Sequence, residues 1–436
     1  MKFAANTLKK LIFLTFTLLL SAEFYGLAFS DVQETLSDVF SFSSDSNEGS
    51  TTFRSLLIPY GGRSESMGSA YTGLSDDISF LQFNPAAGSI QKETQLSVFH
   101  NSWIADSKLD SIAFTTRTGN FSWGTLLSCF YVPFTEYNLF GDRVASSYYS
   151  ETVAGINGSY NFLAGYNFKG IALGSTFKTA LRGMPDYTDN NTNEIISHSG
   201  LSQSAVAFMA DFGIMMQFNF LKYYSSRDPN VRIGLSAMNM GAAFTGLGSD
   251  EGLKIDAGLP ALFCAGISLC PVKPVLLSVD FKQPVNFFDA STYLIPYLQS
   301  GIAIQFTSFL SVLGGFELKG GNPKISAGFE FETMKIRFNA NYSLDLTTSF
   351  NPVNKISISA KVLFGDKGRS LISDKVDELY KTGLIYYSQG DWQNAINTWN
   401  QALKLNKRFD PAILGIQSAQ LQIDMFKMIE ESLQLD

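Results

Sequence analysis

Few residues in this sequence are of the types that usually perform catalysis, and none of them stands in a familiar catalytic pattern. The chain has two histidines, His100 and His198, in unlike surroundings, and three cysteines with no close pair. No HExxH, CxxC, GxSxG or Walker sequence is present, so nothing indicates a metal site, an activated nucleophile or a phosphate-binding loop. We therefore expect no enzyme, no metal site and no cofactor. A hidden carboxylate pair, as in barrel-borne hydrolases, is the alternative that the sequence leaves open.

The composition favours a β-rich chain with a large apolar surface. Of the 436 residues, 38 are Phe and 18 are Tyr, and aromatic residues are enriched in strands. Charged residues make up 16% of the chain, compared with about 25% in typical soluble domains. The net charge of −7 and the lack of a dense basic run exclude the electrostatic footprint of a nucleic-acid-binding protein.

The elements that must position any binding residues are strands, and the clearest is MKIRFNANYSLDL, residues 334–346. Apolar Ile336 and Phe338 alternate with polar Lys335, Arg337 and Asn339, and the alternation continues to the end of the stretch. Because strand side chains point to opposite faces with a period of two, this strand has one apolar and one polar face. In a soluble exported sandwich the apolar face meets protein. In an outer-membrane barrel it meets lipid, and the polar face lines the lumen.

About 14 such strand candidates follow one another between residues 94 and 365. The connections after the second, eighth, tenth and twelfth are short, whereas those after the third, fifth and seventh, at 133–149, 184–203 and 245–260, are long. Short turns at one end and long loops at the other are typical of an outer-membrane barrel. We therefore predict an all-β transmembrane barrel of about 14 antiparallel strands at 94–365. The apolar run at 205–221 leaves a membrane helix as an alternative there.

The N-terminus has the features of a secretory signal peptide. Lysines precede an apolar run at 11–20, and Ala28 and Ser30 place small residues where cleavage would occur. We predict a signal peptide at 1–30, with a retained signal anchor as the alternative. The residues between it and the barrel, 31–93, form a predicted N-terminal segment that begins polar and becomes Gly-rich.

The most distinctive stretch of the sequence lies within this segment, at residues 61–90. It is too irregular for a strand, and Asn84 before Pro85 predicts a stiff corner. The stretch resembles the N-terminal segment of the FadL-like family of outer-membrane transporters for hydrophobic compounds, in particular its spirochaetal and PorV-like branches. The residues that carry this resemblance are Gly62, Arg63, Met67, Gly68, Ala70, Tyr71, Thr72, Leu74, Asp76, Asp77, Asn84, Pro85 and Ala86.

In that family the N-terminal segment folds into the barrel as a hatch, and the ligand crosses it and leaves sideways through a gap in the wall. The resemblance implies a hatch at residues 53–93. Its hatch residues would be Gly62, Arg63, Met67, Gly68, Asp76, Asp77, Asn84, Pro85 and Ala86. A barrel of this size is too wide for its own side chains to fill, so it needs a plug or a channel. We expect Asp76 and Asp77 to pair with lumen cations such as Arg337 or Lys335, or else to form a solvated turn or helix cap.

A long aromatic loop is the candidate for capturing a ligand. The stretch VPFTEYNLFGDR contains Phe134, Tyr137, Leu139 and Phe140. Exposed aromatic residues on an outer loop would suit an apolar ligand. The alternative is that these side chains form an aromatic girdle or pack on one another.

The composition changes to helical after residue 365, and residues 370–436 form a predicted small helical domain. Residues 377–412 resemble one tetratricopeptide repeat, in which Tyr386, Trp392 and Trp399 stand at the repeat's spacing and would contact a partner. Asp391 is a predicted N-cap, and a third helix is predicted from Asp410. Because one repeat is too few to stack stably, this domain must dock on the barrel, dimerise or bind a partner. The alternative is a plain helical hairpin that only packs.

These observations predict an outer-membrane protein whose C-terminal domain lies in the periplasm. The resemblance implies passive uptake of hydrophobic molecules, with long-chain fatty acids as the substrates. The expected partners are outer-membrane lipid, hydrophobic small molecules and a periplasmic protein bound by the helical domain, with no nucleic acid. The alternative function is a non-transport scaffold or shuttle whose repeat recruits that periplasmic partner.

Overall fold

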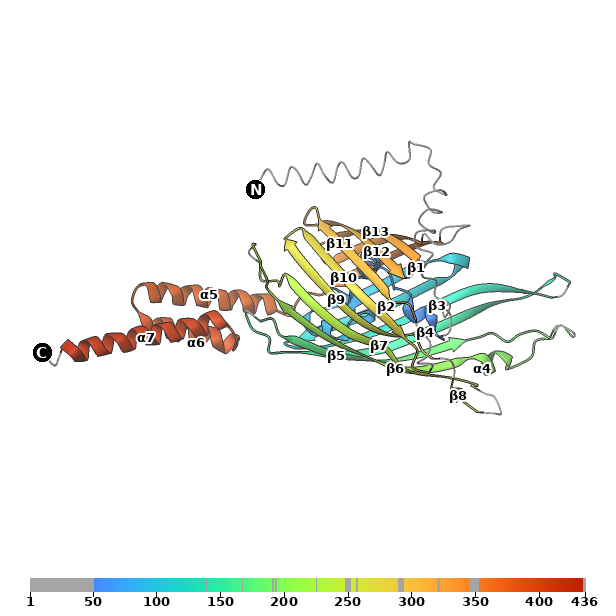
Figure 1. Cartoon of the computed structure of the whole chain (residues 1–436), viewed down its shortest axis with the longest axis horizontal. Helices are drawn as coiled ribbons and strands as arrows, with labels where there is room; N and C mark the ends of the chain where they lie inside the picture. Colours follow the sequence, from blue (N-terminus) through green and yellow to red (C-terminus); the bar gives the residue numbers. More distant parts are fainter. Residues whose placement is uncertain are drawn as a thin grey trace, which may run out of the picture.

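The computed structural model describes residues 51–433, except 139, 167, 190–191, 193, 225, 248–251, 256–257, 289–293, 320–321 and 346–352. The predicted signal peptide at 1–30 therefore lies outside the described residues, as does the first part of the N-terminal segment. The described part contains a large barrel and three C-terminal helices that extend from one end of it (Figure 1).

Fourteen antiparallel strands in the described part of the chain form the barrel. They are β1 (Gln95–Ser102), β2 (Lys108–Thr118), β3 (Phe121–Tyr137), β4 (Arg143–Phe162), β5 (Ile171–Gly183), β6 (Ala205–Phe218), β7 (Val231–Thr245), β9 (Ala261–Val272), β10 (Val275–Val285), β11 (Tyr297–Gln305), β12 (Leu310–Lys319), β13 (Asn322–Thr333), β14 (Ile336–Asp345) and β15 (Val353–Leu363). Each strand pairs with its neighbours in the chain, and β1 pairs with β15 to close the ring. The two-residue β8 (Lys254–Ile255) adds only to the end of β7. The predicted barrel of about 14 strands is confirmed.

The alternation in β14 places its apolar side chains outside and its polar ones in the lumen. Phe338 and Tyr342 are each 45% exposed, whereas Asn339 and Asn341 are nearly fully buried. The soluble-sandwich alternative is wrong, because the sheet is one closed ring and not two packed layers. The run at 205–221 forms β6 and not a membrane helix. The sequence also places the start of β14 too early, since Met334 and Lys335 form the turn before it.

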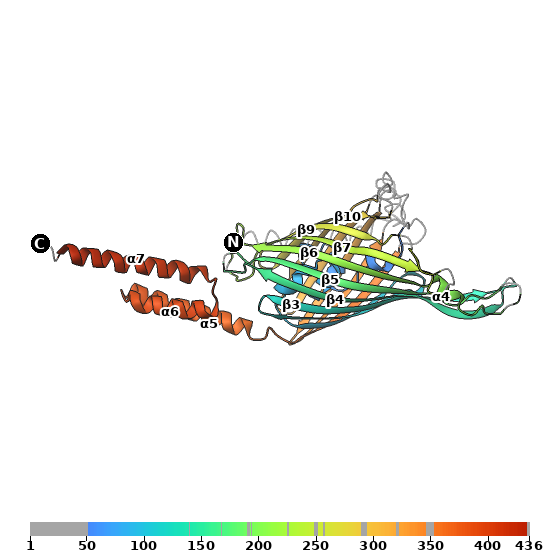
Figure 2. The same cartoon turned by 90° about the horizontal axis from the view of Figure 1, so that it is seen from below.

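The two ends of the barrel differ, and we call them the turn end and the loop end. The turn end carries short connections at 119–120, 273–274, 306–309 and 334–335, together with the longer 163–170 and 219–230. The loop end carries the long connections at 184–204 and 246–260, the first of which contains α4 (Ser199–Gln203). The connection predicted as a loop at 133–149 is largely strand, because β3 and β4 continue beyond the other strands as a projecting hairpin (Figure 2).

The C-terminal helices are α5 (Arg369–Ser388), α6 (Trp392–Leu405) and α7 (Asp410–Leu433), and they share a small core of their own. Trp399 is buried at its centre and donates a hydrogen bond to the Tyr380 carbonyl at 3.2 Å. Asp391 accepts a hydrogen bond from the Asn394 amide at 3.2 Å, so the predicted N-cap is confirmed. The predicted start of the third helix at Asp410 is also confirmed. In the described part of the chain, no helix has the length and hydropathy needed to span a membrane.

The helices contact the turn end of the barrel. Arg227 lies 2.8 Å from Asp374 and also pairs with Asp377, and both carboxylates belong to α5. The rings of Tyr166 and Phe409 meet edge to face with centroids 5.0 Å apart. These contacts place the helical region outside the lumen, at the opposite end from the long loops.

Candidate functional site

The segment before β1 runs through the barrel lumen from the loop end to the turn end. Its short helices are η3 (Arg54–Leu57), α3 (Arg63–Ser66), η4 (Ile78–Gln82) and η5 (Pro85–Ile90). The Thr52 amide donates to the Gly258 carbonyl at 3.0 Å at the loop end, and the Thr94 amide donates to the Gly365 carbonyl at 2.9 Å at the turn end. Most of the segment's residues are buried against the barrel wall. We call residues 53–93 the hatch.

The wall meets the hatch through a set of lumen-facing glycines that we call the glycine belt. It consists of three cross-strand pairs: Gly174 with Gly213, Gly234 with Gly266, and Gly301 with Gly315. A Cβ atom at any of the six would lie within 3.0 Å of hatch atoms, and at Gly174, Gly234, Gly266, Gly301 and Gly315 those include hatch backbone. The belt therefore lets the hatch backbone lie directly on the wall backbone, which no larger residue would allow.

Side chains from the wall also hold the hatch backbone. Ser236 and Ser268 donate hydrogen bonds to the carbonyls of Phe83 and Gly73, at 2.7 and 3.2 Å. Similar bonds to other hatch carbonyls come from Arg232, Asn157 and Lys282. Because the hatch has little regular structure, its short helices and turns leave some carbonyls for partners outside it, and these wall donors bind such carbonyls. These donors lie on β4, β7, β9 and β10, so several strands of the wall hold the hatch in place.

Asn84 forms the corner that the sequence predicts. Its backbone is extended, and its side-chain oxygen accepts a hydrogen bond from the Ala86 amide at 3.1 Å. Its side-chain amide donates to the Thr72 and Ile214 carbonyls, both at 3.1 Å. One fully buried side chain therefore joins two parts of the hatch to β6 of the wall.

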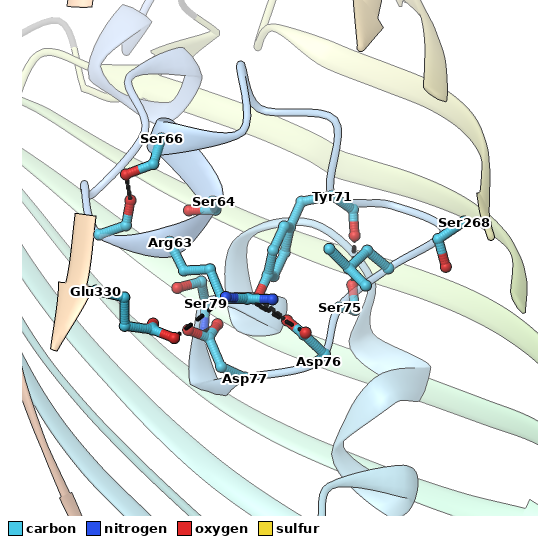
Figure 3. A network of polar contacts seen from close by, with 12 residues as sticks. Arg63, Ser64, Ser66, Tyr71, Ser75, Asp76, Asp77, Ser79, Ser268 and Glu330 are labelled. Atoms are coloured by element: carbon cyan, nitrogen blue, oxygen red, sulfur yellow. Dashed lines mark hydrogen bonds and ion pairs between the residues drawn. The ribbon is translucent and has the colours of Figure 1, made fainter. Parts of the chain in front are cut away.

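A buried group of charges joins the hatch to β13 and β15, and we call it the charged latch. Figure 3 shows its members Arg63, Asp76, Asp77 and Glu330. Arg63 lies 3.1 Å from both Asp76, within the hatch, and Glu330, on β13. Asp77 forms an ion pair with Lys361 on β15, whose ammonium is also 3.8 Å from Glu330. Lys361 and Asp77 are fully buried, so each depends on the other to offset its loss of hydration.

The sequence named the right carboxylates but the wrong partners. Arg337 pairs instead with Glu332 at 2.8 Å, and Lys335 lies exposed in the turn before β14. The expected helix cap is also present, because Asp77 accepts a hydrogen bond from the Ser79 amide at 2.9 Å at the start of η4. Asp77 therefore serves both as a cap and as an ion-pair partner.

The electrostatics of the charged latch favour the ionised forms of Asp76 and Asp77. Burial alone would raise the pKa of Asp76, but Arg63 and then Arg232 outweigh burial and hold that pKa well below its ordinary value. Burial likewise opposes ionisation of Asp77, and Lys361 lowers its pKa in spite of it. Because both pKa values are depressed, the stabilisation is present above the ordinary carboxyl pKa and is lost only as the pH falls toward the lowered values.

A cavity of about 820 Å³ lies between the hatch and the loop end. Hatch residues form one side of it, and the loop-end parts of the strands form the other. Its apolar lining includes Phe53, Leu56, Ile58, Phe130, Met238 and Leu262. Its charged lining includes Lys324, 3.3 Å from Glu317, and Lys355, 2.8 Å from Glu65. The cavity is therefore amphipathic, and these two of its cations are held in ion pairs.

Lys282 differs from Lys324 and Lys355 in its surroundings. It is 6% exposed, lines the cavity, donates a hydrogen bond to the Ser69 carbonyl at 2.9 Å and lies 4.5 Å from the centroid of the Phe83 ring. Within the described residues, no carboxylate is recorded at ion-pair distance from its ammonium, although buried Asp280, two residues away in β10, interacts with it electrostatically. A buried ammonium with so few partners can bind an anionic group that enters the cavity.

The candidate ligand loop lies away from this cavity. Phe134, Tyr137 and Phe140 are exposed on the hairpin of β3 and β4 and do not line the cavity, and Leu139 is outside the described residues. Sequence reasoning missed both Lys282 and the glycine belt. A signal for the belt was present, because glycines in the interior of strands often mark a close approach of another backbone.

The candidate partner-binding residues of the helical region face its own core. Trp399 is buried, Tyr386 is partly buried against the same core, and the ring of Trp392 packs 4.9 Å from that of Phe426. Gly383 and Gly415 both lie against Trp399, where a Cβ atom would meet the indole ring. These aromatic residues therefore hold the three helices together.

Comparisons with known proteins give both sequence relatives and structural likenesses. Two UPF0164 proteins of Treponema pallidum (strain Nichols) are 27% and 26% identical to this chain, over 86% and 84% of it and 84% and 74% of the relatives. The barrel resembles the CymD monoaromatic hydrocarbon channel, with 14% identity, a TM-score of 0.47 and coverage of 70% of this chain and 97% of that one. It also resembles the KdgM porin, with 6% identity, a TM-score of 0.32 and coverage of 62% and 99%. A model of the uncharacterised protein family UPF0164 matches residues 31–367, and the chain belongs to that family.

Proposed function

We propose that this protein is an outer-membrane channel for the passive uptake of hydrophobic molecules, with long-chain fatty acids as its substrates. The observation that carries the proposal is the amphipathic cavity between the hatch and the loop end, whose lining combines apolar side chains with the buried ammonium of Lys282. A hydrocarbon chain would contact Phe53, Leu56 and Ile58, and a carboxylate would bind Lys282. The resemblance of the hatch to that of FadL-like transporters supports the same function.

The outer surface of the barrel supports a place in the outer membrane. Strands β9 to β15 are between 9 and 12 residues long, close to the roughly 9–11 residues that a tilted strand needs to cross a bilayer. Their outward positions carry large exposed apolar side chains such as Phe281, Phe329 and Phe338. So large an apolar surface is favourable against lipid and unfavourable against water.

The wall beside the cavity contains a fork that would suit a sideways exit. β7 pairs with β9 only as far as Met238, opposite Leu262, although β7 continues to Thr245 along β6. At the fork Asn239 has a positive φ of 58° and donates to the Pro260 carbonyl at 3.1 Å. Met238 and Leu262 both line the cavity, so the strands diverge where a bound ligand would reach the wall.

Uptake itself is the test of this proposal. We expect labelled fatty acid to enter a lipid-depleted strain that expresses the protein several-fold faster than the same strain without it. A variant truncated before α5, which lacks the three C-terminal helices, should retain uptake, because the cavity and hatch lie wholly within the barrel. If uptake never depends on the protein, and the truncation instead removes a co-purifying periplasmic protein, the scaffold function replaces transport.

Lys282→Met is expected to weaken fatty-acid binding specifically. Loss of one charge-assisted hydrogen bond costs about 1.5–3 kcal/mol, which is roughly a ten- to hundredfold increase in Kd. Binding of the fatty alcohol of the same chain length should change little, because it brings no carboxylate. Titration of both ligands into the purified barrel measures this difference. Lys324→Met is the matched control, since that lysine already pairs with Glu317. An equal loss for acid and alcohol would mean that Lys282 only supports the hatch.

Phe329→Arg is expected to impair membrane assembly more than Ile336→Arg. Phe329 pairs with Ala340 near the middle of β13 and β14, whereas Ile336 begins β14 at the turn end. An arginine on the lipid face costs about 2–4 kcal/mol at the midplane and about 0–1 kcal/mol near the interface. The yield of heat-modifiable barrel in the membrane fraction compares the two variants. Equal yields would argue against lipid on this face.

A further inference from the structure

The last helix, α7, has a second apolar face that nothing in the described chain covers. Its first face carries Ala412, Ile416, Ala419 and Ile423, which pack in the core of the helical region. The second face carries Leu414, Leu421 and Met428, each about 60% exposed, together with the less exposed Met425. Because the two sets are offset by two residues, or about 200° around a helix, they lie on opposite sides of α7.

The spacing of the second face indicates a helix as its occupant. Leu414, Ser418, Leu421, Met425 and Met428 follow one another at intervals of four, three, four and three residues. This is the seam of a coiled coil, with leucine at two of the three d positions and serine and methionine at the a positions. Terminal helices of helical repeats normally present a polar outer face, and α7 does not. The barrel does not cover the seam either, because Leu414, Leu421 and Met428 remain about 60% exposed beside the rest of the described chain.

We propose that this face of α7 binds the same face of α7 in a second copy of the chain, forming a parallel two-helix contact. Copies inserted in one membrane in the same sense carry α7 on the same side and in the same direction, so a two-fold axis along the membrane normal makes the helices parallel. In that register Gln417 faces Gln422 of the second copy, and Asp424 faces Ile429 of the second copy. No like charges oppose each other across the seam. The inference is independent of what crosses the barrel.

Single-cysteine cross-linking in the native membrane tests this contact. In a full-length background in which Cys129, Cys264 and Cys270 are replaced by Ala, we expect Leu421→Cys and Met428→Cys to form disulfide-linked dimers under mild oxidation. Residues at d positions of a parallel pair meet their own counterparts, so the linked peptide should join 421 to 421 or 428 to 428. Gln420→Cys is the matched control, because it is equally exposed but lies about 100° away around the helix.

A second measurement keeps the result independent of disulfide chemistry. Leu421→Glu combined with Met428→Glu should raise the dimer Kd of the detergent-solubilised full chain at least tenfold, as measured by light scattering, while the barrel stays heat-modifiable. A Leu421→Cys yield no higher than that of Gln420→Cys overturns the proposal. It is equally overturned if the Leu421→Cys variant links to a different protein, or if the wild-type chain is a monomer at every concentration tested.

Discussion

Lys361→Met should displace the hatch from its place in the lumen and let ions pass through the barrel. The methionine would fill similar space but remove the cation that pairs with the buried carboxylate of Asp77, whereas Glu330 would keep Arg63 as its partner. Breaking a buried ion pair by removing one partner costs about 3–5 kcal/mol, because the remaining charge is left without water or a counter-charge. We expect larger and noisier conductance in planar bilayers than for the wild type, together with a lower temperature for the heat-modifiable transition.

Two further variants show whether this effect comes from the charged latch. Lys361→Met combined with Asp77→Asn should recover much of the loss, because the uncompensated charge is then removed. Lys335→Met serves as the control, since that lysine is exposed in a turn and should tolerate the change. Wild-type conductance and thermal behaviour in Lys361→Met would mean that the ion pair does not hold the hatch.

Gly315→Ala should displace the hatch although it adds a single methyl group. A Cβ atom at Gly315 would lie within 3.0 Å of the backbone of Met67 and Gly68, and backbone on both sides leaves nothing flexible to move aside. Overpacking of this kind typically costs about 1–3 kcal/mol. We expect a raised leak of small ions in bilayer recordings and faster proteolysis of the hatch in purified protein.

The neighbouring glycine offers a close control for the glycine belt. Gly314 precedes Gly315 in β12 and faces the outside of the barrel. A Cβ atom there would meet Ile302 at an ordinary contact distance of 3.5 Å. Gly314→Ala should therefore leave conductance and proteolysis unchanged. If the two alanine variants behave alike, close contact between the hatch and β12 is not what seals the lumen.

The barrel and the helical region could be predicted from the sequence because the patterns that indicate them are local. Alternation within β14 shows one apolar and one polar face whatever its neighbours are, and the lengths of the connections show which ends of the strands lie together. The N-cap at Asp391 depends on residues within one helical turn. Strand boundaries were less accessible. The hairpin of β3 and β4 extends through residues that look like a loop, because strand pairing there overrides local propensity.

The candidate site was accessible only in part. Its hatch residues were found from a resemblance, but the cavity, Lys282 and the glycine belt were not. Asp77 and Lys361 are 284 residues apart, and no local pattern joins them. Period-two alternation predicts that both Lys361 and Arg337 face the lumen. It therefore cannot show which of the two pairs with Asp77.

The sequence by itself determined a β-barrel pattern, an irregular Gly-rich segment before it and a helical region after it, since each depends on short-range periodicity and composition. Only the tertiary structure decided which lumen side chains meet the hatch. Those contacts depend on the register between strands and on closure of the ring, which bring Gly301 beside Gly315 and both against Met67. Register and closure are set by many non-local pairings at once, and therefore no single stretch of the chain reveals them.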